Sequence, residues 1–122
     1  MKTGRNRVID ALDLARKGDI GRANRLLHQM KKSPDLEADA YYGLGLIQLC
    51  QNNTKNAHEF FYKATQCDES HADAYYQLAK IADSQGDPMT AVLYLKSAVA
   101  RKSGHVMAIE ALEEHGVFAA SS

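Results

Sequence analysis

Tryptophan is absent from the 122 residues of this chain, and only two cysteines and two prolines occur. Charge of one sign is missing as well, because 15 Lys and Arg residues balance 15 Asp and Glu residues. A nucleic-acid-binding protein usually has an excess of cationic side chains, which its phosphate contacts need. The balanced total therefore argues against nucleic acid as the partner.

Long hydrophobic runs are also lacking. No stretch of about 18 apolar residues occurs, so the sequence predicts no transmembrane helix. The first ten residues, MKTGRNRVID, carry charges but lack the apolar segment of a secretory signal. Without an export signal, Cys50 and Cys67 are expected to be reduced thiols. These features together predict a cytoplasmic protein.

Patterns that support catalysis or metal binding are missing too. Cys67 and His71 lie four residues apart, but two ligands do not make a zinc site. His71 and His105 occupy one position of an internal repeat, which indicates a role in a loop. We find neither a Ser-His-Asp arrangement nor a glycine-rich phosphate loop. The sequence therefore predicts a protein that is not an enzyme and uses no cofactor and no metal.

What the sequence does contain is an internal repeat. The segments ADAYYGLG, from residue 38, and ADAYYQLA, from residue 72, share six of eight letters and start 34 residues apart. Residues 38–71 and 72–105 are identical at 11 of 34 positions without a gap. Residues 4–37 form a weaker copy, in which Leu27 stands in the column of Phe61 and Leu95. A fixed period of this length is typical of stacked repeat proteins.

Each copy has the pattern of two helices. In residues 72–105, Leu78 and Ile81 share one helical face, and Gly86 follows as a residue that commonly ends a helix. Asp87 and Pro88 then supply an N-cap and a first helical residue for the second helix. Residues 106–116 predict a further helix that caps the last repeat. Strand patterns are absent, so we expect an all-α fold of about seven antiparallel helices.

The repeats resemble the tetratricopeptide repeat, a 34-residue motif with Leu-Gly after an aromatic residue and fixed Ala and aromatic positions. Two groups of residues carry the resemblance: Tyr41 with Leu44 and Gly45, Tyr75 with Leu78 and Ala79; and Ala57, Phe61, Ala64, Ala91, Leu95, Ala98. Arg7, Asp10, Glu69 and Ser103 depart from it, and Pro34 lies one place early. A pentatricopeptide repeat is disfavoured because its period is 35 and it is usually basic.

The resemblance implies a right-handed α-α superhelix. It also implies a single domain over residues 4–116. That domain would contain repeats at about 4–37, 38–71 and 72–105 and a capping helix at about 106–116. Residues 117–122 would form a flexible tail.

In this family the first helices of the repeats line a concave groove that holds a peptide or helix of another protein. The corresponding candidates here are Val8, Leu12, Tyr42, Leu46, Leu49, Asp73, Tyr76, Lys80 and Asp83. Tyr42, Leu46 and Leu49 share one helical stripe, which either meets a partner or packs on neighbouring first helices. Asp73 and Asp83 would favour a ligand that carries Lys or Arg.

Other functions of such repeats lead to different expectations. A clamp for a chaperone's C-terminal carboxylate needs cations, but its positions hold Val8, Leu12, Gly43, Asp73 and Gln77. We therefore expect an apolar or amphipathic peptide or helix as the ligand of an adaptor or scaffold. One alternative is a self-assembling homo-oligomeric scaffold, and a second is a chaperone-like holder of a secreted or assembling subunit.

Overall fold

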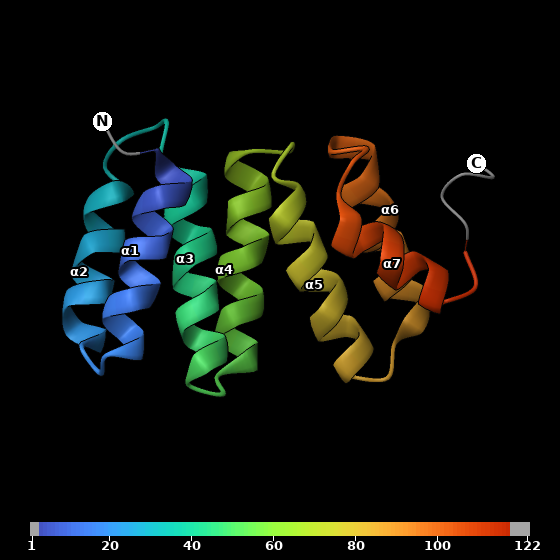
Figure 1. The fold of residues 1–122 in the computed structure, drawn as a ribbon, viewed down its shortest axis with the longest axis horizontal. Coiled ribbons are helices and arrows are strands. Elements are labelled where there is room, and N and C mark those ends of the chain that lie inside the picture. The colour runs from blue at the N-terminus through green and yellow to red at the C-terminus, as the bar shows by residue number, and fades with distance from the viewer. Residues whose placement is uncertain (1–2, 118–122) are drawn as a thin grey trace. The chain divides into compact units, whose positions relative to one another are not determined.

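The computed structural model describes residues 3–117, which form seven α-helices and no strand (Figure 1). The helices are α1 (Gly4–Arg16), α2 (Ile20–Met30), α3 (Glu37–Cys50), α4 (Thr54–Cys67), α5 (Ala72–Ser84), α6 (Pro88–Arg101) and α7 (Val106–Glu114). The predicted all-α fold is confirmed. Of the predicted flexible tail, residues 118–122 lie outside the described part of the chain. None of the helices in residues 3–117 has the length and apolar character needed to cross a membrane.

The chain divides into two compact units. Unit 1 is Met1–Asp68 and contains α1–α4, and unit 2 is Glu69–Ser122 and contains α5–α7. Helices α3, α5 and α7 begin within one residue of the starts predicted from the 34-residue period. The grouping of the repeats into one domain over residues 4–116 stays a prediction.

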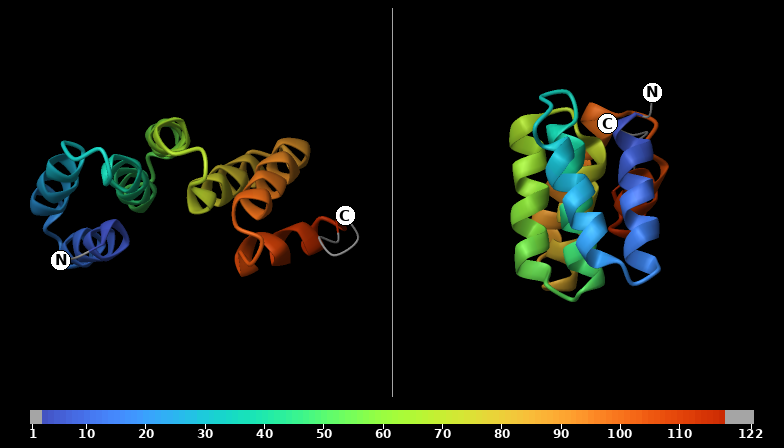
Figure 2. Two further views of the ribbon diagram at one scale, coloured as in Figure 1. Left: turned by 90° about the horizontal axis from the view of Figure 1, so that it is seen from above. Right: turned by 90° about the vertical axis from the view of Figure 1, so that its left-hand side faces the viewer.

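Unit 1 is built from helix pairs joined by short turns. Helix α1 packs against α2 and α3, and α3 also packs against α2 and α4 (Figures 1 and 2). Leu27, Leu44 and Phe61 are among the buried residues that fill the space between these helices. A methyl group on Gly45 would lie 2.5 Å from Phe61 Cε1, so the glycine lets α3 approach the ring on α4.

Unit 2 repeats this arrangement with different residues. Helix α5 packs against α6, and α6 packs against α7 (Figure 1). Ala79 occupies the position of Gly45, and Leu95 occupies that of Phe61; both are buried. The smaller leucine leaves room for the alanine methyl group, so a close helix pair forms here without glycine.

The turn between α5 and α6 follows from three adjacent residues. Gly86 has φ 75°, in the left-handed region that favours glycine. Asp87 Oδ1 accepts a hydrogen bond from Thr90 N at 3.2 Å, and Pro88 is the first residue of α6. The helix end and start predicted from this sequence are confirmed.

Candidate functional site

The predicted groove residues of unit 1 come from α1 and α3. Val8 belongs to the core and is only 4% exposed, so it offers a partner almost no surface. Leu12, Tyr42 and Leu46 are half-buried and pack against the same core. Leu49 is half-buried at the next position of the α3 stripe. The structure therefore leaves a partly exposed apolar stripe, made of Leu12 on α1 and the three residues on α3.

Both tyrosines of the first Tyr-Tyr pair contact aromatic rings of α4. The Tyr42 ring is tilted by 50° against Phe61, with 5.7 Å between the ring centroids. Tyr41 stacks on Phe60 at 6.2 Å, and Lys31 Nζ lies 5.4 Å from the Tyr41 centroid. The contact with Phe61 fixes one side of Tyr42, and the half-buried ring keeps a partly exposed surface.

The predicted residues of unit 2 lie on α5, and two of them are already hydrogen-bonded to α7 or its caps. Asp73 Oδ1 lies 2.7 Å from His105 Nε2, before the start of α7. Asp83 Oδ2 lies 2.9 Å from His115 Nε2, just after the end of α7. The carboxylates thus link α5 to both ends of α7, and they remain 43% and 40% exposed. Each pair joins residues 32 positions apart in the sequence, and this shared spacing is the only sequence signal that could have indicated the two contacts.

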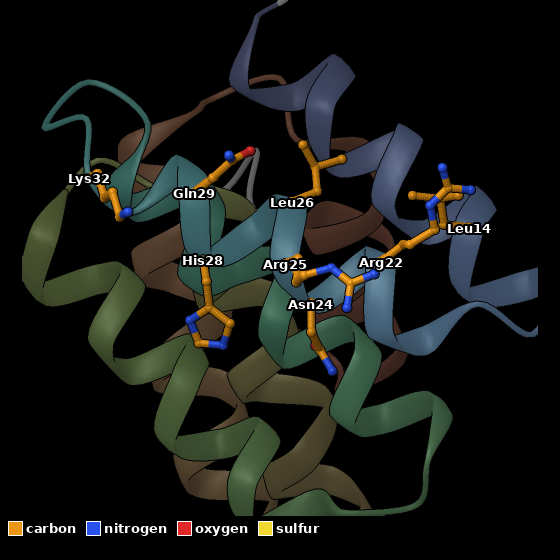
Figure 3. A pocket seen from close by; sticks show the side chains of 8 residues that line it. All are labelled: Leu14, Arg22, Asn24, Arg25, Leu26, His28, Gln29 and Lys32. Atoms are coloured by element: carbon orange, nitrogen blue, oxygen red, sulfur yellow. The ribbon is translucent and has the colours of Figure 1, made fainter.

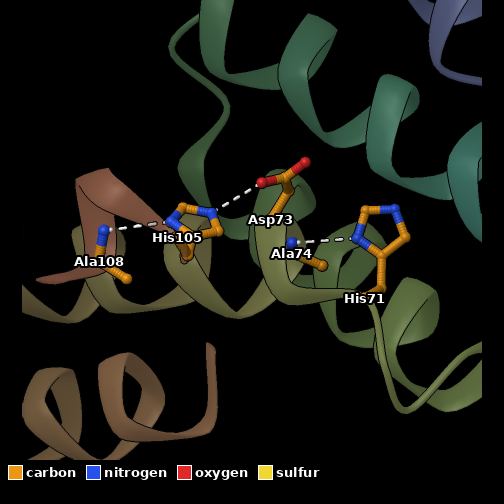
Figure 4. A network of polar contacts seen from close by, with 5 residues as sticks. All are labelled: His71, Asp73, Ala74, His105 and Ala108. Carbon is orange, nitrogen blue, oxygen red and sulfur yellow. Dashed lines mark hydrogen bonds and ion pairs between the residues drawn. The ribbon is translucent and has the colours of Figure 1, made fainter. Parts of the chain in front are cut away.

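His105 performs two structural roles with one ring (Figure 4). Its Nδ1 accepts a hydrogen bond from Ala108 N at 3.1 Å, which caps α7. Since Nδ1 is an acceptor, Nε2 carries the proton and donates to Asp73. The His105 side chain is only 6% exposed, so its bond to Ala108 N is buried, whereas its bond to the half-exposed Asp73 is only partly buried.

His71 caps α5 in the same way. Its Nδ1 accepts from Ala74 N at 3.2 Å (Figure 4). The shared position of His71 and His105 in the repeat therefore corresponds to a shared capping role. Within residues 3–117, no group of three His, Cys, Asp or Glu side chains is placed to hold a metal ion.

Tyr76 lies at the centre of the polar contacts of unit 2. Its ring centroid is 5.4 Å from that of His105, and Lys80 Nζ lies 5.6 Å from the Tyr76 centroid. Burial raises the pKa of the Tyr76 hydroxyl, and the negative charges of Glu114 and Glu110 raise it further. This direction indicates that Glu110 and Glu114, two of the three carboxylates of α7, lie near the tyrosine. The acidic side chains near the predicted residues of unit 2 therefore come from α7 as well as from α5.

Comparisons with known proteins match one repeat of the chain to a family model and the fold to several solved structures, including those of MamA and YrrB. The family model described as tetratricopeptide repeat matches residues 60–93, from within α4 to within α6. A crystal structure of MamA has a TM-score of 0.67 at 23% identity, covering 93% of this chain and 69% of MamA. YrrB, described as a TPR protein with an unusual peptide-binding site, has a TM-score of 0.69 at 19% identity.

The match to YrrB covers 93% of this chain but 58% of YrrB, so the chain spans less than two thirds of that protein. No curated protein matches the chain. At these identities, the structural similarity shows a common fold.

Proposed function

This chain carries a tetratricopeptide repeat and has the fold of such proteins, and on that premise we propose that it binds a segment of another protein without catalysing a reaction. The peptide-binding site of YrrB supports this proposal by analogy of fold. The ligand we propose is an apolar or amphipathic peptide or helix that also carries Lys or Arg.

The observation that carries the proposal is the partly exposed apolar stripe of unit 1. Leu46 and Leu49 follow Tyr42 by four and seven residues, so their side chains lie along one side of α3. Covering about 300 Å² of such surface is worth roughly 7 kcal/mol before the costs of association. We propose these three residues and Leu12 as apolar anchors. Val8 is left out because the core already covers it.

Unit 2 by itself offers a second candidate surface for binding, formed by the α5 residues. Asp73 and Asp83 keep exposed surface beside their histidine partners, so their carboxylates can also accept from a ligand cation. Lys80 is exposed, and Tyr76 is half-buried between Lys80 and His105. These positions favour a ligand segment that carries Lys or Arg over a purely apolar one.

The test is a selection from a displayed peptide library, followed by binding measurements with two matched variants. Leu49→Asp places a charge in the proposed stripe, and Leu93→Asp makes the same change at a 65% exposed leucine on α6. We expect selected peptides to be amphipathic and cationic, to lose binding to Leu49→Asp, and to keep binding to Leu93→Asp. Circular dichroism would verify that both variants stay helical. Equal binding by the two folded variants would remove the stripe from the site.

The wider biological role rests on the sequence alone. A cytoplasmic location, an adaptor or scaffold role and the alternative of a chaperone-like holder all stay predictions. The alternative of self-assembly has a separate structural argument.

A further inference from the structure

The balanced total charge conceals a strong separation of charge along the chain. Residues 1–36 contain nine Lys and Arg and four Asp and Glu, which gives a formal net charge of +5. Residues 37–122 contain six basic and eleven acidic residues, which gives −5. Because opposite charges gather in different segments, electrostatic attraction between two copies of the chain can be strong even though each copy is neutral overall.

Part of this positive charge lies on the exposed side of α2, which also borders a hollow of about 680 Å³ (Figure 3). The hollow is lined by Leu14, Arg22, Asn24, Arg25, Leu26, His28, Gln29 and Lys32. No carboxylate belongs to this lining. Arg22 does contact Asp19 Oδ2 at 3.6 Å, but both side chains are exposed and such a pair is weak. Leu14 and Leu26 are half-buried and give the hollow an apolar part.

The exposed side of α7 has the opposite character. Its exposed residues are Val106, Met107, Glu110, Glu113 and Glu114, so it presents three carboxylates and no cation. Val106 and Met107 are 62% and 54% exposed, so this side of α7 also offers two large apolar side chains. The buried side of the same helix, with Ala108 and Leu112, packs within unit 2. This division leaves one acidic face with an apolar end.

We propose that the basic face of α2, formed by Arg22 and Arg25 of the helix and Lys32 of the turn after it, docks around the hollow on the acidic face of α7 of a second copy. The three cations of one face can pair with the three carboxylates of the other. Val106 and Met107 supply apolar side chains for the part of the hollow formed by Leu14 and Leu26.

The complementarity has consequences for the assembly. The two faces are different surfaces, so the contact is heterologous. Each copy can bind one neighbour through its α2 face and another through its α7 face. Each face is a single short helix, which is small compared with a stable interface. The association is therefore weak, rapidly reversible and strongly dependent on salt.

The first measurement needs no variant. Sedimentation velocity of the full chain should show a weight-average mass that rises with protein concentration in low salt. Raising the ionic strength from about 0.01 M to about 1 M shortens the screening length from roughly 30 Å to roughly 3 Å and should return the mass to that of a monomer. A monomer at all concentrations in low salt would overturn the proposal.

Charge reversal then locates the contact. One variant carries Arg22→Glu, Arg25→Glu and Lys32→Glu, and the other carries Glu110→Lys, Glu113→Lys and Glu114→Lys. Each variant alone presents two faces of the same sign, so its association should weaken by at least about tenfold. An equimolar mixture should associate again, because the first variant keeps a native α7 face and the second keeps a native α2 face.

A matched control separates local from overall charge. Lys55→Glu, Lys96→Glu and Lys102→Glu change three exposed lysines outside both faces and alter the net charge by as much as the α2 variant does. This control should associate more strongly than the α2 variant. Equal association of the two would overturn the proposal.

Folding and competing ligands can be tested in the same series. Circular dichroism would verify that each variant keeps its helices. If a triple variant unfolds, the milder single variants Arg25→Ala and Glu110→Ala replace it, and each should reduce association. Failure of the mixture of folded variants to associate would also overturn the contact. Binding of a single-stranded nucleic acid to α2 by a chain that stays monomeric would assign the basic face to a different partner. These experiments use the chain without any peptide, so a negative result would not bear on the proposed peptide binding by the apolar stripe of unit 1.

Discussion

The first helices of the α3–α4 and α5–α6 pairs share the segment Ala-Asp-Ala-Tyr-Tyr, but the two pairs reach close packing by different means. In α3–α4, a glycine at position 45 faces the large ring of Phe61. In α5–α6, Ala79 and the smaller Leu95 occupy the same positions. The two pairs therefore keep a similar combined volume of two facing side chains, although neither residue type is the same in both.

The ends of the helices differ between the two pairs as well. Leu36 precedes α3 and supplies no side-chain cap, whereas His71 caps α5. The turn before α4 uses Asn52 at φ 61°, and the turn before α6 uses Gly86 at φ 75°. Asn and Gly are the residues that tolerate this backbone region, so the same turn geometry is reached with either.

The largest expected effect comes from making the first pair resemble the second at one position only. Gly45→Ala should lower the free energy of unfolding by about 1–3 kcal/mol, because the new methyl group overlaps the buried Phe61 ring. This loss exceeds the gain of about 1 kcal/mol that alanine brings to a helix interior. Urea denaturation would measure the change.

The double variant Gly45→Ala/Phe61→Leu sharpens this prediction. It reproduces the Ala79 and Leu95 combination of the second pair, so it should be more stable than the single Gly45→Ala variant. If Phe61→Leu instead lowered the free energy of unfolding of the Gly45→Ala variant further, the two positions would not share one packing volume.

The next effect concerns a histidine cap of the kind that α3 lacks. His105 caps α7 as His71 caps α5. His105→Ala removes the acceptor for Ala108 N and the partner of Asp73, so the free energy of unfolding should fall by about 1–2 kcal/mol. His105→Asn keeps an acceptor for the cap and should lose less. Urea unfolding and amide exchange in α7 would rank the three proteins, and an unchanged exchange rate in His105→Ala would contradict the capping role.

A smaller effect tests the turn between α5 and α6. Gly86→Ala forces a side chain into the left-handed region and should cost about 1 kcal/mol, although nothing lies within 4 Å of the added carbon. Gly86→Asn should cost less, as the native Asn52 turn indicates. Gly104→Ala serves as the control in thermal unfolding, because its added carbon also meets nothing within 4 Å. Equal costs for Ala at positions 86 and 104 would contradict the strain argument.

The smallest effect is a pH dependence at the start of α6. Hydrogen bonds with Thr90 lower the pKa of the Asp87 carboxyl, so the folded state favours the ionised form. The resulting stability is present above the carboxyl's ordinary pKa and is lost as the pH falls through its lowered value in the folded protein. Asp87→Asn should therefore unfold more easily near neutral pH and approach the native protein in acid. A stability difference that stayed constant down to about pH 2 would contradict this prediction.

The features predicted correctly from the sequence depend on neighbouring residues or on the repeat. Gly86, Asp87 and Pro88 define their turn by local backbone chemistry, and the 34-residue period located the starts of α3, α5 and α7. The pairing of His115 with Asp83 could not be derived in this way, because it depends on how α7 packs in unit 2. Val8 was chosen by its repeat position, which does not reveal that its side chain is buried in the core of unit 1.

Asp73 is a proposed ligand-binding residue, and it also anchors the last helix through His105. Its carboxylate holds His105 at the first turn of α7, yet 43% of the side chain remains open to solvent. An incoming ammonium or guanidinium group would draw electron density from the oxygens that His105 uses. A ligand cation bound by Asp73 would therefore share one carboxylate with the residue that caps α7.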